Sequence, residues 1–151
     1  MKKWLLVLAL CALPGKSRAW FGYTSPAEFD PTVTFCVSVS SGVEAVPGTG
    51  INGNAKMVPF TFTANSWYLT GNASGSAVVD VVKDSLANFP PTTADTIVSA
   101  STPSASSVQW SSGTTSGWAT TTFTQGEYVD LNIVSISTFK RLQFCVQGKK
   151  Q

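Results

Sequence analysis

The feature that most constrains this chain is a series of short segments in which apolar and polar residues alternate with a period of two. Each segment is four to eight residues long and is bounded by Gly, Pro, Asn or Ser. Beyond the first 19 residues, no window has the apolar spacing of an amphipathic helix, and at most one helical turn is expected, in 84–89. The pattern predicts strands at 33–40, 58–63, 66–70, 77–83, 96–100, 107–110, 119–124, 128–135 and 141–146.

Short strands joined by polar turns predict an all-β fold: an antiparallel β-sandwich of about eight or nine strands, of jelly-roll type. The length of 151 residues suits a single core, which we place at 32–151, after an irregular lead-in at 20–31 that contains two prolines. In the segment GTGINGN, Asn52 and Gly53 predict a tight hairpin turn. The same segment lacks the Gly-Lys-Ser/Thr ending of a phosphate-binding loop.

The first 19 residues are typical of a cleaved secretory signal. A basic MKK precedes the apolar run WLLVLALCAL, and SRA before Trp20 provides a cleavage site. The apolar run is too short to span a bilayer as a helix, so no stable membrane span is expected after cleavage. Two alternatives stay open: a lipoprotein anchored at Cys11, and an uncleaved apolar segment that packs in an assembly.

The net charge of +2 depends on this leader. Cleavage removes Lys2, Lys3, Lys16 and Arg18, which leaves six basic and eight acidic residues and a net charge of −2. The remaining basic residues include only two small clusters, Lys140–Arg141 and Lys149–Lys150. Nucleic-acid binding is therefore not expected.

Outside the leader the chain keeps two cysteines, Cys36 and Cys145. The alternation in VTFCVSVS and RLQFCVQG places both on the polar face of a strand, one near each end of the domain. If the two strands are antiparallel neighbours, one cross-strand disulfide can form. The alternative is two reduced cysteines that do not touch, and an oxidising compartment favours the bond.

The chain has no histidine, which excludes Ser-His-Asp and Cys-His catalysis and Cys/His zinc sites. Paired carboxylates are the remaining catalytic option, and Asp80 and Asp84 are the candidates. The favoured alternative is that Asp80 lies at a sheet surface, paired with a lysine or with loop backbone, while Asp84 and Asp95 occupy turn or cap positions. We expect no catalytic residue, no metal site and no cofactor, although a calcium site from loop carboxylates stays open.

The aromatic residues give the stronger functional signal. Trp67, Tyr68, Trp110 and Trp118 lie among hydroxyl and amide side chains, an arrangement that suits stacking on sugar rings or binding a partner protein. The alternative is that Trp110 and Trp118 cap the core of the sandwich, because tryptophans are on average highly buried. Asn72 begins a glycosylation sequon, NAS.

Two segments carry a family resemblance: SGSAVVDVVKDSLANFPPTTADTI at 74–97 and GWATTTFTQGEYVDLNIVSIST at 117–138. Together they resemble a β-rich module of tailed-phage and prophage tail-fibre or virion proteins, over roughly 42–146. The resemblance implies a structural or adhesive role on a virion, homo-oligomers or contacts with other virion proteins, contact with host surface sugars, and no catalytic residues. A secretory leader and a disulfide depart from this pattern, because such virions assemble in the cytoplasm.

The resulting hypothesis is a non-enzymatic structural or adhesin module, displayed on a virion or exported to a surface. The alternative is a secreted carbohydrate-binding module that uses exposed tryptophans, Trp110 and Trp118 above all. A third hypothesis is a carboxylate-dependent hydrolase, which requires Asp80 and Asp84 to face each other across an open cleft.

Overall fold

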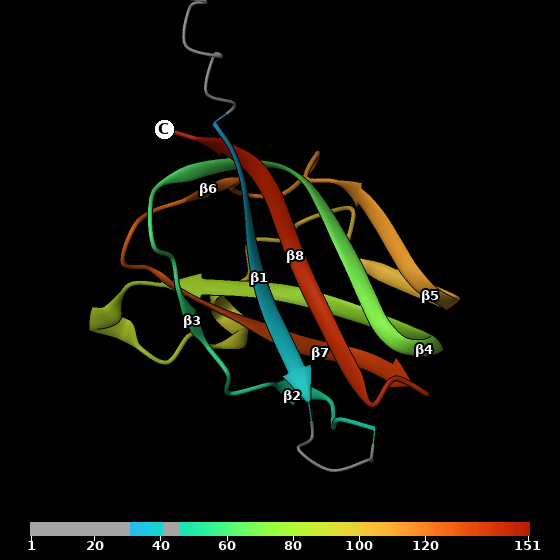
Figure 1. Cartoon of the computed structure of the whole chain (residues 1–151). Helices are drawn as coiled ribbons and strands as arrows, with labels where there is room; N and C mark the ends of the chain where they lie inside the picture. Colours follow the sequence, from blue (N-terminus) through green and yellow to red (C-terminus); the bar gives the residue numbers. More distant parts are fainter. Residues whose placement is uncertain (1–30, 41–45) are drawn as a thin grey trace, which may run out of the picture. The chain divides into compact units, whose positions relative to one another are not determined.

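The computed structural model describes residues 31–40 and 46–151, so the leader, nearly all of the lead-in and the residues after the first strand lie outside the described part (Figure 1). Eight strands are described, and every pairing between them is antiparallel. They are β1 (Thr32–Ser40), β2 (Gly50–Ile51), β3 (Lys56–Met57), β4 (Phe62–Asp84), β5 (Ser104–Thr114), β6 (Thr122–Phe123), β7 (Tyr128–Ser137) and β8 (Arg141–Lys150). Two 3-10 turns, η1 (Leu86–Asn88) and η2 (Thr93–Asp95), follow β4. The predicted all-β fold with a single helical turn in 84–89 is confirmed.

The 23-residue strand β4 takes part in both layers of the fold. Its first half pairs with β8, its second half pairs with β7, and β5 pairs with residues on both sides of the bend. Figure 1 shows β4 doubling back at a bend, so that its halves lie in different layers. The first layer has the order β1, β8, β4 and β5, and the second has β2 and β3, then β7, then β4.

The winding of the chain follows from this order. From β1 in the first layer it passes to β2 and β3 in the second, and β4 crosses from the first layer to the second. After β4, a single bridge from Thr96 to Val82 extends the second layer. The chain then places β5 in the first layer, β7 in the second and β8 in the first. The eight described strands thus belong to one antiparallel sheet that curls over on itself into a sandwich-like half-barrel. The predicted sandwich and its neighbouring first and last strands are confirmed.

The bend in β4 explains why the predicted strands 66–70 and 77–83 are one, whereas of the predicted strand 58–63 only Phe62 and Thr63 belong to a strand. Gly71 and Gly75 lie at the bend, where the register with β5 shifts, and the ring of Phe139 fills the space that their side chains would occupy. Phe139 is fully buried. The sequence between Thr70 and Ala77 has the composition of a loop, but its backbone continues the strand around the corner.

Three other predictions are wrong in whole or in part. Of the predicted strand 119–124 only Thr122–Phe123 forms a strand, β6. The segment 96–100 forms no strand, because Thr96 makes one bridge and the chain then turns through Ser101, whose φ is 56°. Asn52 and Gly53 do not close a hairpin, because β2 and β3 both pair with β7 and not with each other. Gly53, with a φ of 74°, instead lies in a kink between β2 and β3, which pair one after the other with β7.

The core lies between the layers and is built largely by alternation of buried and outward residues along the longer strands. Phe35, Val37 and Val39 of β1 face it, as the sequence predicts, and the next strands repeat the pattern. Phe62 and Phe123 stack with ring centroids 4.9 Å apart. The other fully buried large side chains include Leu69, Val79, Leu131, Ile133, Leu142 and Phe144.

The carboxyl group of Asp130 is fully buried, although on β7 it alternates with the core residues Val129 and Leu131. It accepts hydrogen bonds from the backbone N–H groups of Leu131 (2.7 Å) and Gly53 (2.9 Å), and so ties the kink after β2 to β7. Burial raises the pKa of Asp130 above its ordinary value of 3.8, and the hydrogen bonds from the backbone oppose this effect. The folded protein therefore binds this proton more tightly than the unfolded chain does.

This raised pKa gives a pH-dependent prediction. The contribution of Asp130 to the free energy of unfolding is greatest below pH 3.8 and is lost as the pH rises through the folded pKa. We expect the free energy of unfolding of the wild type, minus that of Asp130→Asn, to fall over this window in urea titrations between about pH 3 and about pH 7.

Asp84→Asn is the control for that measurement, because hydrogen bonds from Ser85 and Asn88 lower the pKa of Asp84. The contribution of Asp84 to the free energy of unfolding is present above pH 3.8 and is lost on acidification. The free energy of unfolding of the wild type minus that of Asp84→Asn is therefore expected to rise with pH. Slopes of the same sign for the two variants would contradict the assignment.

Candidate functional site

The outer face of the first layer gathers the polar and aromatic side chains of four strands. Antiparallel partners share a face, and the register of β4 with β8 and β5 places Tyr68 beside Cys145 on one side and beside Ser112 on the other. On β8 the outward residues alternate with buried ones, since Leu142, Phe144 and Val146 all face the core. The outward residues of β8 are Arg141, Gln143, Cys145, Gln147 and Lys149.

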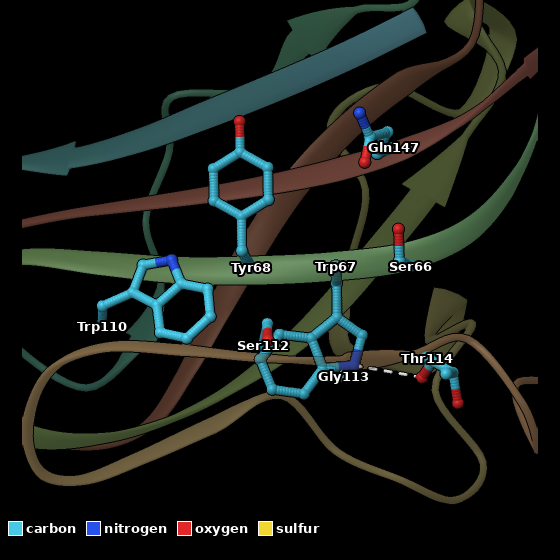
Figure 2. A pocket seen from close by; sticks show the side chains of 8 residues that line it. All are labelled: Ser66, Trp67, Tyr68, Trp110, Ser112, Gly113, Thr114 and Gln147. Atoms are coloured by element: carbon cyan, nitrogen blue, oxygen red, sulfur yellow. Dashed lines mark hydrogen bonds between the residues drawn. The ribbon is translucent and has the colours of Figure 1, made fainter. Parts of the chain in front are cut away.

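A groove of about 510 Å³ lies on this side of the molecule, along β4 and β5. Figure 2 shows its lining, with Tyr68 and Trp67 projecting to opposite sides of β4 and Trp110 next to Tyr68. Trp110 is 60% exposed, which is unusual for so large an apolar side chain. The lining residues are Ser66, Trp67, Tyr68, Trp110, Ser112, Gly113, Thr114 and Gln147.

The groove depends on the contact between Trp67 and Gly113. The indole of Trp67 lies against the backbone of Gly113, where a Cβ atom would come within 2.7 Å of Cζ2. Its Nε1 donates a hydrogen bond to the carbonyl of Thr114 at 3.1 Å. Only 6% of Trp67 is exposed, so it fixes the position of β5 more than it offers a free surface.

The disulfide supports the other side of Tyr68. Cys36 and Cys145 are directly opposite in the register of β1 and β8, with Cα atoms 4.0 Å apart and a sulfur–sulfur bond of 2.05 Å. The predicted cross-strand disulfide is confirmed, and it is compatible with an extracellular or otherwise oxidising location. The hydroxyl of Tyr68 lies 4.0 Å from the sulfur of Cys36, so the phenol ring extends from β4 toward the disulfide.

Of the four predicted binding residues, the structure brings Trp67, Tyr68 and Trp110 together and separates Trp118 from them. Trp118 is 8% exposed and stacks on Phe144, with centroids 6.4 Å apart. Its Nε1 donates to the carbonyl of Ser101. Trp118 thus belongs to the core, as the alternative interpretation had it, whereas Trp110 does not.

A second hollow of about 240 Å³ adjoins the groove on the same face. Outward residues of β1, β4 and β8 line it, among them Thr70, which is two residues along β4 from Tyr68 and pairs with Trp110 of the groove. Sequence reasoning singled out Asn72 as a sequon and Arg141 as part of a basic pair, but it did not predict that these residues and Gln147 lie on one face, because only the strand register brings them together. The outward lining residues are Ser38, Ser40, Thr70, Asn72, Arg141 and Gln143.

Asp80 and Asp84, the candidates for carboxylate chemistry, have separate partners. Asp80 accepts a hydrogen bond from the hydroxyl of Thr96 at 2.5 Å, and Asp84 accepts from the backbone N–H of Ser85 at 2.6 Å. Asp95 forms a capping box with Thr92, as expected of a cap residue.

Other features of the described residues bear on metals and membranes. Lys83 pairs with Glu127 at 2.7 Å, not with Asp80 as one alternative had it. Among the described residues, no three acidic or cysteine side chains gather in a group that could hold a metal ion. Within the same part of the chain, no helix has the length and apolarity needed to cross a bilayer.

Comparison of the chain with known protein families, with characterised proteins and with solved structures finds no match in any of the three. The resemblance to tail-fibre and virion modules therefore stays a prediction. The functional argument rests on the outer face of the first layer.

Proposed function

We propose that this protein is a non-enzymatic adhesive module that binds a glycan in the groove of Tyr68 and Trp110. The observation that carries the proposal is the indole of Trp110, which is 60% exposed in a groove whose lining also includes the phenol of Tyr68, several hydroxyls and an amide. Aromatic rings stack on the apolar faces of sugars, while Ser66, Ser112 and Gln147 supply hydrogen-bonding groups for their hydroxyls. Jelly rolls are a common scaffold of lectin and capsid domains.

Display on a surface is the second part of the proposal. The signal-like leader and the disulfide support export, and the resemblance supports a place on a virion. We infer that the domain serves as a structural scaffold that presents the groove on a surface, and that its partners are further copies of this chain or other surface proteins. Sedimentation of the mature protein tests the oligomer, and a single monomeric species at all concentrations would exclude it.

The groove makes a direct prediction for Trp110. Trp110→Ala is expected to weaken binding on a glycan array at least about tenfold, because a stacking platform at the centre of a site carries much of the binding free energy. Val108→Ala is the matched control, since Val108 is on the same strand and is 40% exposed, but does not line the groove. Binding that is unchanged by Trp110→Ala, or no binding by the wild type, would exclude this function.

A further inference from the structure

The charged residues are divided unevenly between the two layers. No residue of β1, of β5, of β8 or of β4 from Phe62 to Gly71 is acidic. The described acidic residues all lie in the second half of β4, in β7 or in the connections next to them; they are Asp80, Asp84, Asp95, Glu127 and Asp130. The strands of the first layer therefore contribute basic side chains to its outer face but no acidic ones.

Two of these cations lie on the face that holds the groove. Arg141 and Lys149 both point outward from β8, one near each end, with Gln143, Cys145 and Gln147 between them. Eight residues of extended strand separate their Cα atoms by roughly 27 Å. Arg141 lines the second hollow, while Lys149 lies two residues from Gln147 in the groove.

The backbone at Arg141 is held in place by β4. The Asn72 side-chain oxygen accepts hydrogen bonds from the N–H groups of Lys140 (2.9 Å) and Arg141 (3.0 Å). The guanidinium of Arg141 forms no ion pair with any described residue. The ion pair that the described part of the chain contains joins Lys83 and Glu127. The guanidinium is exposed, has no ion-pair partner within 31–40 and 46–151, and lies beside hydroxyl and amide groups, so it is suited to bidentate binding of a carboxylate.

We propose that the ligand of this face is an acidic glycan chain, whose carboxylates bind Arg141 and Lys149 while a sugar ring stacks on Trp110. This inference rests on the proposed function, because it names the class of glycan that the same groove takes. The spacing of the cations calls for an oligosaccharide that runs along β8 through both hollows, and a single sugar cannot reach both ends. The absence of acidic side chains from these strands removes the repulsion that would otherwise oppose such a ligand.

The test is an array of uronate-containing oligosaccharides, each paired with its carboxyl-reduced form, which keeps the ring and removes the charge. We expect the full-length wild type to prefer the acidic member of each bound pair, with binding that weakens as salt is raised. Arg141→Gln and Lys149→Gln are each expected to weaken binding of the acidic form about fivefold and to leave the reduced form unaffected.

Lys150→Gln is the matched control, because it makes the same charge change next to Lys149 on the opposite face of β8. The ammonium of Lys150 lies 5.2 Å from the ring of Phe60, away from the groove. Equal binding of acidic and reduced forms, or equal effects of Arg141→Gln and Lys150→Gln, would overturn the inference.

The two proposals fail in different ways. The wild type could bind the acidic and the reduced member of a pair equally, and lose both in Trp110→Ala. That result would support the proposed glycan binding and overturn the preference for an acidic glycan. Binding to nucleic acid or anionic lipid, insensitive to Trp110→Ala, would overturn both. Binding to no glycan at all would also overturn both.

Discussion

Reduction of the Cys36–Cys145 disulfide is expected to lower the free energy of unfolding by about 4 to 5 kcal/mol. The two cysteines are 109 residues apart, so the bond closes a loop that includes nearly all of the fold. Opening it restores the conformational entropy of that loop to the unfolded chain. Urea titrations with and without a reductant measure the difference as a shift of the midpoint.

The double variant Cys36→Ala/Cys145→Ala separates the covalent effect from other actions of the reductant. It is expected to match the reduced wild type and to show no further change when the reductant is added. Because the Cα atoms are already 4.0 Å apart in a regular antiparallel register, the strands need no rearrangement when the bond is absent. Equal midpoints for oxidised and reduced wild type would contradict the prediction.

Trp118→Ala is expected to cost about 3 to 5 kcal/mol of folding free energy, because it removes a large core side chain and leaves a cavity next to Phe144. The change also removes the hydrogen bond from the indole to the carbonyl of Ser101. Thermal and chemical denaturation measure the loss.

Trp110→Ala makes the identical substitution on the surface and is the control for Trp118→Ala. It is expected to change stability by no more than about 0.5 kcal/mol, while it removes glycan binding. A stability loss of similar size in both variants would mean that Trp110 also supports the core.

The contrast between these two tryptophans shows where sequence reasoning stops. Both stand among serine, threonine and glycine, and nothing in their immediate neighbours distinguishes them. The register of β5 places Trp110 opposite Thr70 on the outer face, whereas the turn after β5 directs Trp118 toward Phe144. Both outcomes depend on residues that are distant in the sequence.

Alternation within a strand, by contrast, is local information, and it predicts correctly which residues of β1 and β8 face the core. The polar-face positions of Cys36 and Cys145 follow from the pattern of their own strands, and only the pairing of those strands had to be assumed. The bend of β4 could not be predicted in this way, because Phe139 fills it from more than 60 residues along the chain. Strands of two residues, such as β2 and β3, are too short for any pattern to reveal.

The register of β1 with β8 has a mechanical consequence, which would matter for the proposed adhesive role. Its outermost described pair joins Thr32 to Lys149, and the disulfide follows four pairs further along the two strands. Tension between the two ends of the domain therefore peels apart no more than the pairs from Thr32 to Phe35 before the covalent bond takes the load. The 108 residues between the two cysteines stay outside the path of that force, so the domain holds its fold under tension that would unravel an uncrosslinked sandwich.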